Sequence, residues 1–191
     1  GLVYNEGERV EGYSNFGFVV LVGLLGRLIR IIPEHRYFLI LAIKLINILA
    51  GGLTLYLSYL FSRKILNRDP VASWLTVFLV AANGAFVIHT ACPMETATYG
   101  AILMGTAYSL ALNAKTGKPL EGRRFLGLLG LLTLLSVWRI DAPVLVGAMG
   151  LGILIHFRGQ LPRAWQKLGL TWLALYTGYT VFRILYFGDI V

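Results

Sequence analysis

Long apolar stretches separated by short polar and basic connections run through almost the whole chain. The clearest are residues 37–61, 71–92, 97–113 and 168–187, the second of them beginning just after Pro70. A helix needs about 20 apolar residues to cross a hydrocarbon core about 30 Å thick, because it rises 1.5 Å per residue. The pattern therefore predicts an all-α, polytopic membrane helical bundle in which these segments are spans.

The apolar stretch 125–157 needs a different interpretation, because it is too long for one span and short for two. Arg139, Ile140 and Asp141 lie at its middle. We predict a hairpin of two short helices, 125–138 and 142–157. The first would be about 21 Å long at 1.5 Å per residue, so the tip of the hairpin is expected just below the outer membrane surface.

Basic clusters set the orientation of these segments. Connections rich in Lys and Arg favour the cytoplasmic side of a membrane. The three clusters lie at residues 63–68, 115–124 and 158–167. All three can be cytoplasmic only if 125–157 goes out and returns, which gives about six spans.

The N-terminal region is predicted to stay on the outer side. As a full span, residues 16–32 would place the acidic segment 1–15 inside and the basic stretch around Arg27 and Arg30 outside, against the usual charge bias. We therefore predict an outer loop segment at 1–15, followed by a helix at 16–32 in the outer interface with these two arginines snorkelling.

Composition supports the membrane interpretation. Hydrophobic residues make up 57% of the chain and charged residues 14%, against about 45–50% and 25% in ordinary soluble domains. The mean hydropathy is +0.72, which excludes an ordinary soluble enzyme or a disordered tail. The net charge of +8 does not favour nucleic acid as a partner, since the basic residues lie between apolar runs. A single cysteine, Cys92, excludes an internal disulfide.

In this topology the motif-like polar groups all fall on the outer face. Glu95, in Cys-Pro-Met-Glu-Thr, could cap the following helix or bind a hydroxyl or cation, and its position favours neither. Arg139 and Asp141 could form a structural ion pair, but an anion site, with the arginine fork on phosphate, is the favoured interpretation. Arg183 could simply snorkel or could help to neutralise a phosphate.

Other polar residues and glycines carry weaker signals. Glu11, Tyr13 and Asn15 suit carbohydrate hydroxyls, although a cap by Asn15 or its neighbour Ser14 is equally simple. Polar residues inside the spans are expected to make interhelical hydrogen bonds, and the Gly-x-x-Gly pairs are expected to mark close helix packing. The polar residues are Lys44, Asn47, Asn83 and His89, and the glycine pairs begin at Gly23, Gly127 and Gly147.

The first sixteen residues, GLVYNEGERVEGYSNF, closely resemble a stretch of bacterial GT-C glycosyltransferases, in particular the arabinofuranosyltransferase-like group, distantly akin to protein O-mannosyltransferases. Later motifs of that group, GxET, R-P-D/E and YxGDxxPN, correspond to 93–96, 139–141 and 186–189. Pro93 stands where the family usually has Gly, and Ile140 where it has Pro. The order of the motifs runs along essentially the whole chain.

The resemblance implies an enzyme that takes a sugar from a polyprenyl-phosphate donor and passes it, with inversion, to a hydroxyl of a glycan, lipid or protein acceptor. The reaction would occur on the periplasmic or external side of a bacterial inner or plasma membrane. The resemblance implies that the catalytic Asp lies upstream of Gly1, so no catalytic residue is expected within this chain. Substrate-binding roles would fall on eight residues: Glu11, Tyr13, Asn15, Glu95, Arg139, Asp141, Arg183 and Asp189. A divalent cation is one candidate cofactor, but the sequence offers no metal-ligand spacing.

Two other hypotheses stay open. A transporter or flippase for a lipid-linked or anionic solute would also carry buried charges and broken helices, although no internal repeat is visible. A non-catalytic helical scaffold would have no need of an exposed polar cavity.

Overall fold

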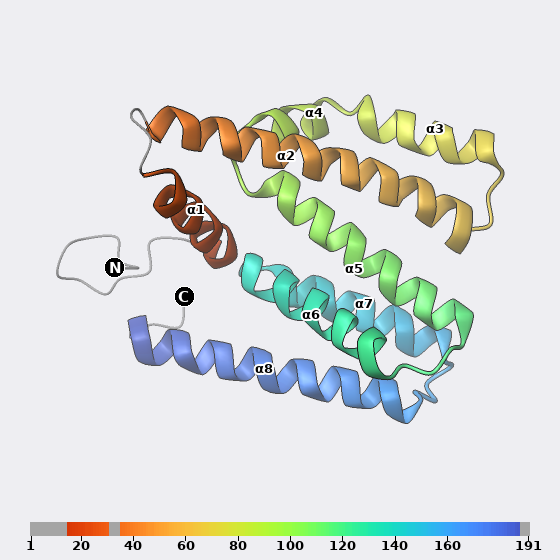
Figure 1. Cartoon of the computed structure of the whole chain (residues 1–191). Coiled ribbons are helices and arrows are strands. Elements are labelled where there is room, and N and C mark those ends of the chain that lie inside the picture. The colour runs from red at the N-terminus through yellow and green to blue at the C-terminus, as the bar shows by residue number, and fades with distance from the viewer. Residues whose placement is uncertain (1–14, 31–34, 188–191) are drawn as a thin grey trace. The chain divides into compact units, whose positions relative to one another are not determined.

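The computed structural model describes residues 15–30 and 35–187, and these form helices joined by short connections (Figure 1). No strand occurs in these ranges, which confirms the all-α class. The helices are α1 (Phe16–Ile29), α2 (His35–Leu60), α3 (Pro70–Ala81), α4 (Gly84–Ala91), α5 (Thr96–Thr116), α6 (Gly122–Trp138), α7 (Ala142–His156) and α8 (Arg163–Phe187), with a π-helical turn, η1 (Phe61–Ile65), continuing α2.

The chain divides into two compact units, each described by itself below. One unit contains residues 18–118 and is called the α2–α5 unit. The other contains residues 1–17 and 119–191 and is called the α6–α8 unit. The predicted spans around Lys44, Asn47 and Glu95 belong to the first unit, and the predicted hairpin around Arg139 belongs to the second.

The α2–α5 unit is built around α2, which packs against α3, α4 and α5. Its buried residues Ile43, Asn47, Ala50 and Gly51 recur every three or four positions and so form one face of the helix. At Gly51 a Cβ atom would lie 2.5 Å from Cγ2 of Thr90 on α4. Only glycine allows the two helices to approach this closely.

The segment predicted as one continuous helix, 71–92, consists of two helices in the structure. Asp69 caps α3, where the N–H of Ala72 donates to its carboxylate at 3.0 Å and lowers its pKa. The helix stops after Ala81, and α4 begins at Gly84 after a bend of 64°. Asn83 causes the break, because its side chain accepts from the N–H of Phe86 at 3.1 Å and so starts a new helix. The expected interhelical hydrogen bond of Asn83 is therefore replaced by a helix cap.

The two basic connections of this unit meet at one end. The α5 helix runs to Thr116, three residues beyond the predicted end at Asn113, and stops at Gly117 with φ +60°. Lys115 in its last turn donates to the main-chain oxygens of Lys64 at 2.6 Å and Ile65 at 3.1 Å. An ammonium group thus satisfies carbonyls that end the α2–η1 helix.

In the α6–α8 unit, α6 packs against both α7 and α8 (Figure 1). Its buried leucines Leu128, Leu132 and Leu135 follow helical spacing, and Leu135 is completely buried. The helices α6 and α7 agree closely with the predicted helices 125–138 and 142–157. Only the start of α6, three residues earlier, and the end of α7, one residue earlier, differ. The third, α8, begins at Arg163 rather than at 168, so the basic residues Arg163 and Lys167 belong to its first turns.

One helix of the described residues is long and apolar enough to cross a membrane, the continuous α2–η1 rod from His35 to Ile65. A second candidate arises if the bent α3–α4 pair counts as a single span, and α1 and α7 are shorter apolar helices. The number of spans, predicted as about six, stays a prediction, as does the interfacial position of α1.

The Gly-x-x-Gly pairs do not mark close packing within either unit. A Cβ atom at Gly23, Gly127 or Gly147 would meet nothing within 4 Å. The prediction failed because spacing alone does not say which face of a helix a glycine occupies. The close approaches occur instead at Gly51 and, as described below, at Gly17.

Candidate functional site

The predicted Arg139–Asp141 pair forms at the tip between α6 and α7. The guanidinium donates twice to the carboxylate, from Nε to Oδ1 at 3.0 Å and from Nη2 to Oδ2 at 3.4 Å. Both side chains remain accessible, at 31% for Arg139 and 54% for Asp141. The two hydrogen bonds agree with the ion-pair interpretation. Because both side chains are partly exposed, the guanidinium is also accessible to a phosphate group.

The backbone of the tip explains the pair. Arg139 is extended, with φ −142° and ψ 149°, because α6 ends at Trp138. Two residues later the main-chain oxygen of Asp141 accepts from the N–H of Val144 at 3.2 Å at the start of α7. The Asp141 side chain makes no capping hydrogen bond to this helix and instead orients the guanidinium plane of Arg139.

The end of the N-terminal motif lies against the same tip. A Cβ atom at Gly17 would lie 2.8 Å from Cε3 and 3.0 Å from Cα of Trp138, the residue that precedes Arg139. Asn15, two residues before Gly17, is half-buried. Trp138 is 8% exposed, and its indole Nε1 has no hydrogen-bond partner among the described residues. A buried N–H group without a partner is costly, and the sequence analysis did not single out Trp138.

Arg183 is connected to this end of the unit through an aromatic ring. Its Cζ atom lies 5.8 Å from the centroid of the Tyr179 ring, within the range of a cation–π contact. The same ring lies 5.6 Å from that of Phe16, the first residue of α1. Residues next to two predicted groups therefore make contacts in this unit: Phe16, next to Asn15, lies against Tyr179, which Arg183 also approaches. Glu11, Tyr13 and Asp189 lie outside the described residues.

Glu95, in the α2–α5 unit, follows a connection that α2 holds in place. Asn47, which is fully buried, donates from Nδ2 to the main-chain oxygens of Cys92 at 2.6 Å and Met94 at 2.7 Å. The hydrogen bonds predicted for Asn47 between helices run instead from α2 to the connection between α4 and α5. One amide group thus fixes the path of the chain immediately before Glu95.

Glu95 does not serve as a side-chain helix cap. It occupies the position before α5, but its carboxylate makes no capping hydrogen bond. Its main-chain oxygen accepts from the N–H of Tyr99 at 2.9 Å and from Oγ1 of Thr98 at 2.8 Å. Glu95 thus occupies the N-terminal position of α5 without a side-chain capping hydrogen bond, and its role in binding a hydroxyl or cation stays a prediction.

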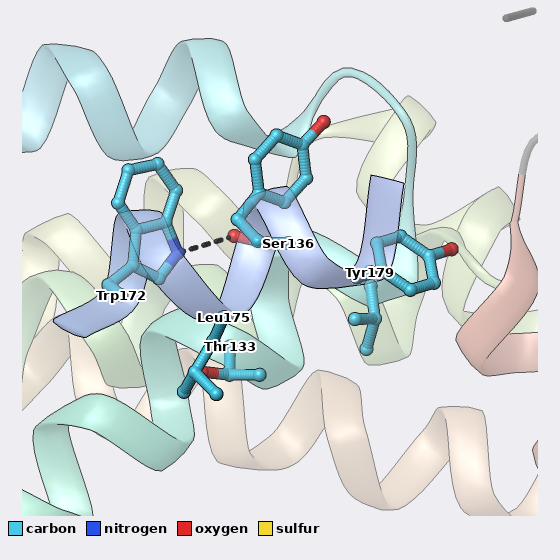
Figure 2. Close-up of a pocket in the computed structure, with 7 residues that line it drawn as sticks. Thr133, Ser136, Trp172, Leu175 and Tyr179 are labelled. Carbon is cyan, nitrogen blue, oxygen red and sulfur yellow. Dashed lines mark hydrogen bonds between the residues drawn. The ribbon is translucent and has the colours of Figure 1, made fainter. Parts of the chain in front are cut away.

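In the α6–α8 unit a small cavity lies between α6 and α8 (Figure 2). Trp172 donates from Nε1 to Oγ of Ser136 at 2.9 Å and stacks on Tyr176 with ring centroids 5.7 Å apart. The volume is about 10 Å³, near the minimum for one water molecule. This cavity is too small for a sugar. The hydrogen bond between Trp172 and Ser136 beside it joins α8 to α6.

We predict that Ser136→Ala lowers the free energy of unfolding by about 1 kcal/mol, because the indole N–H of the half-buried Trp172 loses its acceptor. Thr133→Val is the matched control on the same cavity wall. The Thr133 hydroxyl is buried without a partner in the described part of the chain, so its replacement by a methyl group should be neutral or slightly stabilising. Denaturant titration of the purified protein in detergent measures both. Equal losses in the two variants would contradict the assigned hydrogen bond.

No group of three or more His, Cys, Asp or Glu side chains that could hold a metal ion occurs among residues 15–30 and 35–187. The divalent-cation hypothesis stays untested, because Glu11 and Asp189 lie outside these ranges. Comparison with protein-family models, curated proteins and solved structures found no match. The likeness to GT-C enzymes therefore rests on the sequence motifs themselves.

Proposed function

We propose that the chain is part of an integral-membrane glycosyltransferase of the GT-C type. It would transfer a sugar from a polyprenyl-phosphate donor to an acceptor hydroxyl on the outer face of a bacterial membrane, with inversion at the anomeric carbon. The observation that carries the proposal is the accessible, bidentate Arg139–Asp141 pair at a helix-hairpin tip.

In each unit, taken by itself, the basic residues lie at one end and the residues of the GT-C-like motifs lie at the opposite end. In the α2–α5 unit Lys115 joins the two basic connections, and Glu95 stands at the opposite end of α5. The 21 residues of α5 span about 30 Å, close to the thickness of the hydrocarbon core. In the α6–α8 unit the basic first turns of α6 and α8 lie at the end opposite the Arg139 tip. Positively charged ends inside and motif ends outside would follow.

The lateral surfaces support a membrane environment. Large apolar side chains are exposed along α2 and α3, among them Leu41, Ile48, Trp74 and Phe78, each between 51% and 66% exposed. Soluble monomers rarely expose contiguous apolar surface on this scale. Lipid or further helices would cover it.

Arg139 would act on the leaving group. Cleavage of the bond between the anomeric carbon and the bridging oxygen leaves negative charge on the polyprenyl phosphate. A pre-oriented guanidinium stabilises this charge most in the transition state. Asp141 aligns the fork and would also contact a sugar hydroxyl, as would Glu95 and Glu11. The general base that takes the acceptor proton is the Asp that the resemblance places before Gly1.

Transport of a lipid-linked or anionic solute is the second candidate, favoured by the 64° break between α3 and α4. Broken helices at membrane depth often form solute sites in transporters. Membranes containing the full-length protein distinguish the two. Supplied with polyprenyl-phosphate-linked pentoses and hexoses and with a hydroxyl-bearing glycan, lipid or protein acceptor, an enzyme glycosylates the acceptor hydroxyl and releases polyprenyl phosphate, whereas a flippase moves the intact molecule across the bilayer. Movement without release would overturn the glycosyltransferase proposal.

The orientation is testable by cysteine labelling in a Cys92→Ser background. Ile140→Cys, at the hairpin tip, should react in intact cells with a membrane-impermeant maleimide, since Ile140 is exposed and predicted to lie outside. Lys118→Cys should react only after the cells are permeabilised. Labelling of residue 118 from outside would refute the proposed topology.

A further inference from the structure

A second cavity lies at the basic end of the α6–α8 unit, where α6 and α8 begin. Its volume is about 330 Å³, within the range of small-molecule sites. Its lining includes two cations, one carboxylate and three apolar side chains: Arg163, Lys167, Glu121, Leu120, Phe125 and Ala164. None of these residues belongs to the candidate site at Arg139.

The two cations are held on ordered helical turns. Arg163 and Lys167 lie one turn apart on α8, and Nζ of Lys167 lies 5.7 Å from the centroid of the Phe125 ring on α6. The buried Trp165 between them packs against Phe157 with centroids 5.8 Å apart. A planar guanidinium and an ammonium group facing one cavity are suited to a phosphate group, which the guanidinium can bind through two parallel hydrogen bonds.

The other lining groups restrict the chemical class of the ligand further. The Glu121 carboxylate disfavours a second negative charge and can accept a hydrogen bond from a ligand hydroxyl. Leu120 is buried at 4% exposure and provides an apolar wall. Leu126 follows Phe125 on α6 and is 65% exposed. Leu170 lies three residues after Lys167 on α8 and is 68% exposed. Exposed apolar side chains are therefore present on both helices beyond the cavity.

We infer that this cavity binds a singly charged phosphodiester that carries a hydroxyl group and an apolar tail, namely the headgroup of an anionic glycerophospholipid in the cytoplasmic leaflet. Basic pockets between membrane helices on the cytoplasmic side bind the headgroups of anionic lipids. The inference uses the proposed membrane orientation, but it does not depend on glycosyl transfer. Loss of transferase activity in an Arg139 variant would leave it unaffected.

The test is native mass spectrometry of the full chain in detergent micelles doped with equal amounts of phosphatidylglycerol and phosphatidylcholine. We expect saturable retention of phosphatidylglycerol over phosphatidylcholine. Arg163→Gln combined with Lys167→Gln should weaken it at least about tenfold, since two charge-assisted hydrogen bonds are lost. Arg163→Lys keeps the charge but not the planar fork. Its retention of phosphatidylglycerol should lie between that of the unchanged protein and that of the double variant.

The matched control is Arg123→Gln combined with Arg124→Gln, which removes the same charge from the first turn of α6 outside the cavity lining. It should change affinity by less than about threefold, because exposed charges are largely screened at physiological salt. Equal loss in the two double variants, or equal retention of both lipids, would overturn the proposal. Saturable binding of inorganic phosphate that displaces phosphatidylglycerol would assign the cavity to a soluble phosphate compound and overturn the lipid assignment. Circular dichroism confirms that each variant is folded.

Discussion

Arg139→Ala is expected to reduce turnover of the full-length protein by roughly 30- to 1000-fold, which corresponds to about 2–4 kcal/mol in the activation barrier. The reason is that negative charge grows on the bridging oxygen as the glycosidic bond breaks, so the guanidinium matters more in the transition state than in the ground state. Donor affinity should also fall. The measurement is release of polyprenyl phosphate per folded molecule, with donor concentration varied to separate kcat from KM.

Two further variants separate the phosphate role from a structural one. Arg139→Lys should recover only part of the activity, because an ammonium group cannot reproduce the planar fork. Arg124→Ala, at the opposite end of the same helix, is the control and should leave turnover unchanged. If the pair is only structural, Arg139→Ala lowers the folded yield while the purified protein turns over normally, and the exchange Arg139→Asp with Asp141→Arg restores the yield. Normal turnover of folded Arg139→Ala would eliminate the phosphate role.

Asn47→Ala is expected to lower the free energy of unfolding by roughly 2–3 kcal/mol. Two short hydrogen bonds to the main-chain oxygens of Cys92 and Met94 disappear from a completely buried position, and their acceptors are left without this donor. The connection before Glu95 should then move more freely. Cys92, which is half-buried, should react faster with a maleimide, and this rate is a direct measure of the released connection.

Asn113→Ala is the matched control for Asn47. Its Nδ2 donates to the main-chain oxygen of Ser109 at 2.8 Å, one turn back on the same helix. A local bond of this kind ties no distant segments together, so its loss should cost less than about 1 kcal/mol and leave Cys92 labelling unchanged. Comparable effects in both variants would contradict the assigned role of Asn47.

The helices were predictable where the sequence carries a local signal. Pro70 with Asp69 before it marks the start of α3, and the polar triplet 139–141 interrupts an apolar run at the point where α6 gives way to α7. The break at Asn83 was missed because a single asparagine in an apolar run fits an interhelical hydrogen bond as well as a helix cap. In the structure its backbone is extended, with ψ 117°, which is the conformation of a helix-capping residue.

The sequence by itself determined the all-α class and most helix limits and offered the Arg139–Asp141 ion pair as one of two interpretations, because periodicity, Pro and charge act over a few neighbouring residues. Only the tertiary structure decided which polar groups meet across the chain. Asn47 reaches Cys92, 45 residues away, and Gly17 lies against Trp138, while a Cβ atom at Gly23, Gly127 or Gly147 would meet nothing within 4 Å. Such contacts depend on the face that each residue presents after packing, and helical spacing fixes that face only relative to the residue's own helix.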